Sequence, residues 1–137
     1  MKEILQMSHF YSMVMCDIRL WDKTTQNYTK MLITVDTGAS VTTISSDILH
    51  MLGYDTTSGV TKRITTASGV SYVKSITLNM MIGQTKLNDI EVYAHNFPEE
   101  SFSQGVLGLN VLMMFDAVNL IFKKSEIEFI TINDSGD

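Results

Sequence analysis

The first clear pattern along the chain is an alternation of residues that is typical of a β-strand. One set of alternate positions between 11 and 20 holds Val14, Cys16, Ile18 and Leu20. A period of two places these side chains on one face, so the pattern predicts a half-buried strand. A polar connection at positions 22–27 and a return strand at positions 28–35 complete a predicted hairpin, which ends at Asp36.

The rest of the chain predicts further strands with short helices between them. A short helix is predicted over positions 47–52, where Gly53 ends it. A long hairpin is predicted over positions 60–82, and its tip lies at Ala67, Ser68 and Gly69. The later predicted elements are a strand at 87–94, a polar loop at 95–104, a short helix at 109–115 and closing strands at 117–122 and 127–132. Many short strands separated by turns predict an all-β barrel or sandwich-like domain with one or two short helices.

Length and composition indicate one globular domain. The 137 residues are 45% hydrophobic and 18% charged, which is enough for a core without disulfide bonds. The net charge of −5 and the lack of any basic run longer than a pair argue against nucleic acid and anionic membranes as partners. No stretch approaches the roughly 18 apolar residues of a membrane span, and the first residues do not resemble a signal peptide. The single cysteine suits a reducing, cytoplasmic compartment.

The sequence Asp-Thr-Gly-Ala-Ser at positions 36–40 is the strongest candidate for chemistry. It lies between an apolar run at 31–35 and a β-branched run at 41–44. A carboxylate at the end of a buried strand is costly unless it is hydrogen-bonded or used in a reaction. The glycine permits a tight turn and the close approach of another backbone. The alternative is a structural Asx turn, since aspartate before glycine is common turn chemistry.

The other residues with potentially reactive side chains are expected to have structural roles. The three histidines are His9, His50 and His95. Their spacing, with one another and with Cys16, is not that of a metal site, so no metal and no cofactor is expected. Cys16 is expected to be a small buried hydrophobic residue. Asn110 is interpreted as a helix-end or packing residue, and Asp116 as a surface or capping residue.

Three features give the Asp-Thr-Gly motif a more specific meaning. It lies between two strand-like runs, a glycine-tipped hairpin follows about thirty residues later, and an apolar segment at 106–112 follows about seventy residues later. In this order the elements resemble the retropepsin-like aspartic proteases, the single-lobe relatives of pepsin. That family has two hydrophobic residues and a glycine before a short helix, which Val106-Leu107-Gly108 matches. The hairpin tip at 66–69 resembles flap sequences of bacterial members.

The resemblance covers positions 10–132. We therefore interpret these positions as a single protease domain, between an N-terminal segment at 1–9 and a polar C-terminal tail at 133–137. Termini often build the dimer sheet in this family. Positions 126–132 suit that role, whereas positions 1–10 are less clearly strand-like.

The resemblance implies a role for each residue of the motif. Asp36 corresponds to the catalytic aspartate, and Thr37 to the threonine whose hydroxyl ties the two active-site loops together across the dimer. Gly38 corresponds to the glycine whose N–H supports the carboxylates. Ala39 stands where pepsin-type enzymes carry a serine donor, which implies activity in mildly acidic to near-neutral conditions. Ser40 either hydrogen-bonds near this loop or simply starts the next strand.

A single motif implies a second chain. Aspartic-protease chemistry uses two carboxylates that share one proton. The only other match to Asp-Ser/Thr-Gly is at positions 134–136, in a polar tail with no strand before it. The resemblance therefore implies a symmetric homodimer in which one Asp36 from each subunit activates a water molecule to hydrolyse a peptide bond.

The resemblance also implies how a substrate binds. The hairpin tip at 67–69 would close as a flap over an extended peptide, without any cofactor. Apolar candidates for the walls of the substrate groove are Val35, Ile64, Val70, Val106 and Leu107. The alternative function is a catalytically inactive peptide-binding or dimerisation module on the same fold.

Overall fold

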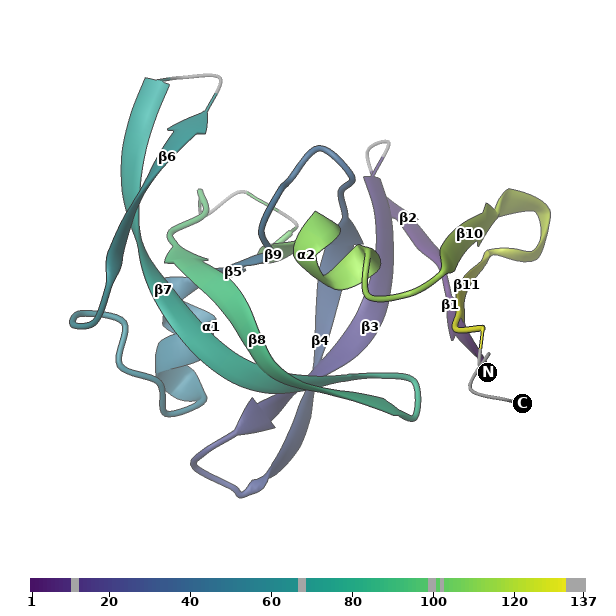
Figure 1. Cartoon of the computed structure of the whole chain (residues 1–137), viewed down its shortest axis with the longest axis horizontal. Helices are drawn as coiled ribbons and strands as arrows, with labels where there is room; N and C mark the ends of the chain where they lie inside the picture. The colour runs from purple at the N-terminus through teal and green to yellow at the C-terminus, as the bar shows by residue number, and fades with distance from the viewer. Residues whose placement is uncertain (11–12, 67–68, 99–100, 102, 133–137) are drawn as a thin grey trace.

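The computed structural model describes residues 1–10, 13–66, 69–98, 101 and 103–132, and its architecture is mainly β (Figure 1). The strands are β1 (Lys2–Gln6), β2 (Ser8–Phe10), β3 (Met13–Asp22), β4 (Asn27–Val35), β5 (Thr43–Ser45), β6 (Thr61–Thr66), β7 (Gly69–Ile82), β8 (Thr85–His95), β9 (Gly105–Leu107), β10 (Ala117–Ile121) and β11 (Glu126–Ile130). The helical elements are α1 (Ser46–Met51), α2 (Leu109–Leu112) and the 3-10 helix η1 (Phe122–Lys124). The predicted all-β class with one or two short helices is confirmed. Within the described residues, no helix is long and apolar enough to cross a membrane.

Eight strands form the main sheet, in the order β2-β3-β4-β9-β5-β8-β7-β6. An additional pairing of β3 with β7, which includes Leu20↔Met80, joins two distant parts of this sheet and gives it a barrel-like form. The predicted hairpin of β3 and β4 is present. Since β4 ends at Val35, Asp36 follows directly at the end of a strand that lies within the sheet.

From Cys16 to Leu20 the core follows the alternation that the sequence shows along β3, whereas Met15, on the opposite face, is also fully buried. Cys16, Ile18 and Leu20 are almost fully buried, whereas Asp17 and Arg19 are exposed. Burying one large apolar side chain stabilises a fold by about 1.5–3 kcal/mol. Burial also raises the pKa of the Cys16 thiol to about 12, with a smaller contribution from the charge of Asp17. The thiol therefore stays protonated, and the expectation of a small buried core residue is confirmed.

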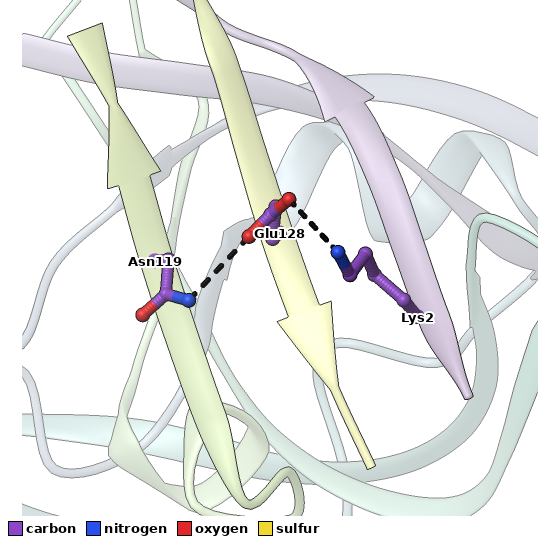
Figure 2. Close-up of polar contacts among 3 residues, drawn as sticks. All are labelled: Lys2, Asn119 and Glu128. Atoms are coloured by element: carbon purple, nitrogen blue, oxygen red, sulfur yellow. Dashed lines mark hydrogen bonds and ion pairs between the residues drawn. The ribbon is translucent and has the colours of Figure 1, made fainter.

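A separate three-stranded sheet, in the order β1-β11-β10, contains both ends of the described chain. Figure 2 shows the Glu128 carboxylate of the central strand between Lys2 Nζ, at 3.3 Å, and Asn119 Nδ2, at 3.5 Å. β1 lies within the less strand-like positions 1–10, yet it forms a regular strand because β11 supplies its hydrogen-bonding partner. The predicted tail at 133–137 lies outside the described residues.

The turn between β3 and β4 is held by the carboxylate of Asp22. Its Oδ1 accepts hydrogen bonds from the Thr24 hydroxyl at 2.5 Å and the Thr24 N–H at 2.8 Å. Its Oδ2 accepts a hydrogen bond from the Thr29 hydroxyl at 3.0 Å. These bonds, the one from the Thr24 hydroxyl above all, favour the ionised form and hold the pKa of Asp22 below its ordinary value.

The variant Asp22→Asn is expected to destabilise the fold at neutral pH and to weaken its dependence on acid. Because the folded-state pKa is lowered, the carboxylate stabilises the fold above its unfolded value of about 3.9. This stabilisation is lost as the pH falls through the folded value. The difference in unfolding free energy between unmodified chain and variant should therefore shrink below about pH 4. The only tryptophan, Trp21, gives the fluorescence signal for denaturation; a difference that stays constant with pH would contradict this account.

Candidate active site

Asp36 lies in a turn that is attached to strand β9. β4 and β9 run parallel, with the pairs Thr34↔Val106 and Val35↔Leu107. The N–H of Asp36 extends this pairing by donating to the carbonyl oxygen of Leu107 at 3.1 Å. The start of the turn is thus fixed by a segment that is distant in the sequence.

Within this turn, the carboxylate of Asp36 accepts a backbone hydrogen bond. The N–H of Gly38 donates to Asp36 Oδ1 at 2.8 Å, and the N–H of Ala39 donates to the Asp36 carbonyl at 3.2 Å. This is the Asx-turn conformation, so the structural alternative and the catalytic interpretation describe the same local geometry. The described residues place no hydrogen-bond donor on Oδ2; Asp36 is half-exposed, and Thr37 is exposed. The carboxylate is therefore oriented and still accessible, as acid–base chemistry requires.

Gly108 brings a second backbone segment directly against the turn. A Cβ at this position would lie 2.8 Å from the Ala39 carbonyl oxygen and 2.8 Å from the carbonyl carbon of Val41. The following residues hold the contact, because the N–H of Leu109 donates to the Ala39 carbonyl at 2.8 Å and the N–H of Asn110 donates to the Ser40 carbonyl at 3.1 Å. Only a glycine permits backbones to pack this closely.

The side chain of Asn110 stabilises the C-terminal end of the same turn, at Thr42. Its Oδ1 accepts hydrogen bonds from the Thr42 N–H at 2.8 Å and the Thr42 hydroxyl at 2.9 Å. Its Nδ2 donates to the Glu91 carbonyl at 2.8 Å. The Thr42 hydroxyl in turn accepts the N–H of Gly108 at 3.0 Å. The sequence predicts a helix-end or packing residue at Asn110, and the structure gives it a larger role that no local pattern indicates.

A double-mutant cycle on Asn110 and Thr42 tests this network. Asn110→Ala is expected to cost about 1–3 kcal/mol of unfolding free energy, because buried donors and an acceptor lose their partners. Thr42→Val removes the hydroxyl that donates to Asn110 Oδ1 and accepts the N–H of Gly108, while the backbone N–H of residue 42 is kept. The two effects should therefore be non-additive by about 0.5 kcal/mol or more in urea denaturation. Strictly additive effects would show that the two side chains act independently.

Two hollows flank the turn. The first, of about 530 Å³, is lined by Asp36 and Thr37 together with apolar side chains that include Val35, Val106 and Phe97. The second, of about 350 Å³, lies between the turn residues 38–41 and the β6 hairpin strand. The Asp36 carboxylate lines the first hollow and the residues that follow it line the second, so both hollows adjoin the same turn.

Only some of the predicted groove residues line the two hollows. Val35 and Val106 line the first hollow, and Ile64 lines the second. Val70 is exposed on the hairpin and lines neither of these two hollows. Leu107 requires a correction, because its side chain is fully buried in the core. It contributes its backbone carbonyl to the site rather than an apolar wall.

The predicted long hairpin is present as the antiparallel pair of β6 and β7, with pairs from Thr61↔Lys74 to Thr66↔Gly69. Figure 1 shows this hairpin extending on the side of the molecule opposite the terminal sheet. Gly69 has φ +123°, a conformation that glycine adopts readily. The other two predicted tip residues, Ala67 and Ser68, lie outside the described residues.

Sequence reasoning missed several polar residues around the hollows. In the first hollow, the Thr34 hydroxyl donates to Ser103 Oγ at 2.7 Å, and both residues are buried. In the second, Tyr93 lines the wall, and burial, with a smaller effect of Glu91, raises the pKa of its phenol. No local pattern indicated these residues, since each reaches the site from a different strand or loop. Within the described residues, no group of three or more His, Cys, Asp or Glu side chains is arranged to hold a metal ion.

Comparisons with known proteins agree with this geometry. A solved structure, that of a retropepsin-like aspartic protease from Rickettsia conorii, is similar to the chain with a TM-score of 0.68. The sequence identity is 21%, and the match covers 94% of this chain and 89% of that one. The fold is therefore that of a retropepsin-like protein, as the resemblance implied.

A family model described as aspartyl protease matches residues 24–111, a range that includes Asp36, Gly108 and Asn110. The chain belongs to the aspartyl protease family. A search of curated proteins gave no match. The family expected from the sequence is thus confirmed.

Proposed function

We propose that this chain is an aspartic endopeptidase that works as a homodimer, in which each subunit contributes one Asp36. The observation that carries the proposal is the turn after β4. There a half-exposed carboxylate, oriented by the N–H of Gly38 at 2.8 Å, faces a hollow of about 530 Å³. Membership of the aspartyl protease family supports the same function.

The proposed hydrolysis depends on the two Asp36 carboxylates lying close together. Two such groups about 3 Å apart cannot both ionise easily, so the pair keeps one proton. The ionised Asp36 takes a proton from a water molecule, while the protonated Asp36 polarises the carbonyl group of the peptide. The water oxygen attacks the carbonyl carbon directly, and no covalent bond to the enzyme forms. The N–H of Gly38 keeps each carboxylate in its orientation throughout.

In the proposed dimer, the two-fold axis lies beside the turn, and the second carboxylate is the Asp36 of the other subunit. The sequence has a single Asp-Thr-Gly motif, and a symmetric dimer places identical residues opposite one another. Thr37 is exposed in the single chain, which leaves its hydroxyl available for a contact across the axis. The half-exposed Asp36 beside it is likewise accessible to its symmetry mate.

The substrate in this proposal is an extended peptide. The two hollows on either side of the turn can each receive a side chain, with Val35 and Val106 in one and Ile64 in the other. The β6–β7 hairpin adds strand edges that can hydrogen-bond to the main chain of a peptide. Apolar walls exclude water from the cleaved bond.

A mixing experiment tests the two-chain site. Unmodified chain is held at constant concentration, unfolded together with about a threefold excess of the Asp36→Asn variant, and refolded. Random pairing then leaves about a quarter of the unmodified chains with an unmodified partner, so peptide cleavage should fall to about a quarter. The same excess of Asp47→Asn, a change to an exposed carboxylate on α1, should increase cleavage instead. Cleavage that is unaffected by the Asp36→Asn excess would rule out a shared site.

The second candidate function is a peptide-binding or dimerisation module without catalysis. The oriented and accessible Asp36 carboxylate favours the enzyme, because a module that only binds has no chemical need for it. If unmodified chain and Asp36→Asn bind extended peptides equally and neither cleaves them, the module is favoured. A cytoplasmic location remains a prediction from the single cysteine.

A further inference from the structure

The β6–β7 hairpin has a charge opposite to that of the chain as a whole. Positions 61–74 contain Lys62, Arg63 and Lys74 and no aspartate or glutamate, whereas the full chain has a net charge of −5. Three of the ten cationic residues thus lie, without acidic neighbours in sequence, on the element that borders the proposed substrate groove. A positive region next to a site raises the local concentration of anionic ligands.

These cationic side chains have no carboxylate partner in the described part of the chain. The ion pairs found there are Lys2–Glu128 and Lys30–Asp17. Lys62 and Arg63 are exposed, and Lys74 Nζ donates a hydrogen bond to the Thr61 hydroxyl at 2.6 Å. Their charges are therefore available to an external anion.

Lys62 is the cation on the face of β6 that also carries the half-buried Ile64. Ile64 and Thr65 line the hollow that the hairpin shares with the catalytic turn. Alternate residues of a strand share a face and are about 6–7 Å apart, so Lys62 lies one step along β6 on the face of Ile64. Arg63 pairs with Tyr72 and projects from the opposite face, which it shares with Thr65. Ile64 is half-buried whereas Thr65 is exposed, so the face of Lys62 and Ile64 is the one turned toward the body of the molecule.

We propose that Lys62 binds an acidic side chain of the substrate, so that the preferred substrates carry glutamate or aspartate close to the cleaved bond. The proposal rests on the proposed peptidase function. A peptide that runs along β6 has the same two-residue repeat as the strand. The acidic residue is therefore two positions from the side chain that occupies the hollow beside Ile64. Arg63 and Lys74 attract the same acidic peptide at longer range.

The test moves one charge along a peptide. A peptide that the protein cleaves, with only neutral residues around the bond, is remade with glutamate at each flanking position in turn, and with glutamine at the same position as its matched partner. The position that matters is two residues from the peptide side chain that occupies the hollow beside Ile64. At this position, glutamate should raise kcat/KM about two- to fivefold over glutamine, which is the effect typical of an exposed ion pair. The preference should fall towards one as the salt concentration is raised.

Variants assign this preference to Lys62. Lys62→Gln should abolish the glutamate preference, and Lys62→Glu should reverse it. Lys86→Gln removes an exposed charge at the far end of β8 and should leave the preference unchanged. A ratio of one at every position, or a preference that survives in Lys62→Gln, would overturn the proposal.

A binding measurement separates this proposal from the proposed function. The Asp36→Asn variant, which should bind without cleaving, is titrated with the glutamate and glutamine peptides by fluorescence anisotropy. Tighter binding of the glutamate peptide to Asp36→Asn, and its loss in the double variant that also carries Lys62→Gln, supports recognition by Lys62 even if no cleavage is found. Equal affinities for both peptides contradict recognition, whatever the outcome for catalysis.

Discussion

Replacing Asp36 with asparagine is expected to lower peptide cleavage by about 10³-fold, because an amide can neither share nor transfer the proton that the reaction needs. The fold should be unaffected. The asparagine Oδ1 still accepts the hydrogen bond that the Gly38 N–H makes at 2.8 Å, and the side chain is half-exposed. The variant's free energy of unfolding should stay within about 0.5 kcal/mol of the unmodified chain.

The measurement pairs a cleavage assay with urea denaturation on the same preparations. Asp47→Asn is the matched control, since it makes the same chemical change on an exposed carboxylate of α1. It should retain full activity. Equal cleavage by the unmodified chain and Asp36→Asn would refute the catalytic role of Asp36, and a large loss of stability in the variant would mean that the carboxylate acts mainly in folding.

Replacing Gly108 with alanine is expected to destabilise the chain by about 3 kcal/mol or more and to abolish cleavage. The backbone of Gly108 has φ −94° and ψ −178°, which any residue can adopt, so the cost is not conformational. It comes from the added Cβ, which would lie 2.8–2.9 Å from backbone atoms of Ala39, Val41 and Thr42. Relief of the clash displaces either the segment at 39–42 or the β9–α2 segment packed against it, and Asp36 is held by both.

Gly69→Ala is the contrasting control. No atom lies within 4 Å of a Cβ at Gly69, but its φ of +123° strains any other residue. Its destabilisation should therefore be about 1 kcal/mol, smaller than that of Gly108→Ala. Urea denaturation of both variants checks the order. If Gly69→Ala lowered the free energy of unfolding more than Gly108→Ala, the close packing of the β9–α2 segment on the turn would not be what makes Gly108 necessary.

The parts of the fold that were predicted from sequence are those with local patterns. Alternation along β3 and the polar stretch before β4 placed the first hairpin correctly. The glycine near position 69 and its flanking β-branched residues placed the second. The spacing of these hairpins from Asp-Thr-Gly and from Gly108 was enough to indicate the family, which the match of the family model confirms.

The parts that were missed depend on partners far along the chain. β1 had a weak pattern and becomes a strand because β11 pairs with it. Leu107 looked like a groove residue from its place beside Val106, yet successive residues of a strand face opposite sides, and Leu107 faces the core. Asn110 reaches Thr42 only because α2 packs against the turn.

By itself, the sequence determined that an acidic residue follows a buried strand on a tight glycine turn, and that a hairpin and a hydrophobic-hydrophobic-glycine element follow it in order. These features depend on residues adjacent in the chain, whose side-chain period and backbone freedom are local properties. Only the tertiary structure decided that the Leu107 carbonyl holds the N–H of Asp36, that Asn110 binds Thr42 at the end of the turn, and that two hollows adjoin this turn. Such contacts join segments about seventy residues apart, and their distances are set by how the strands pair and pack rather than by any pattern within one segment.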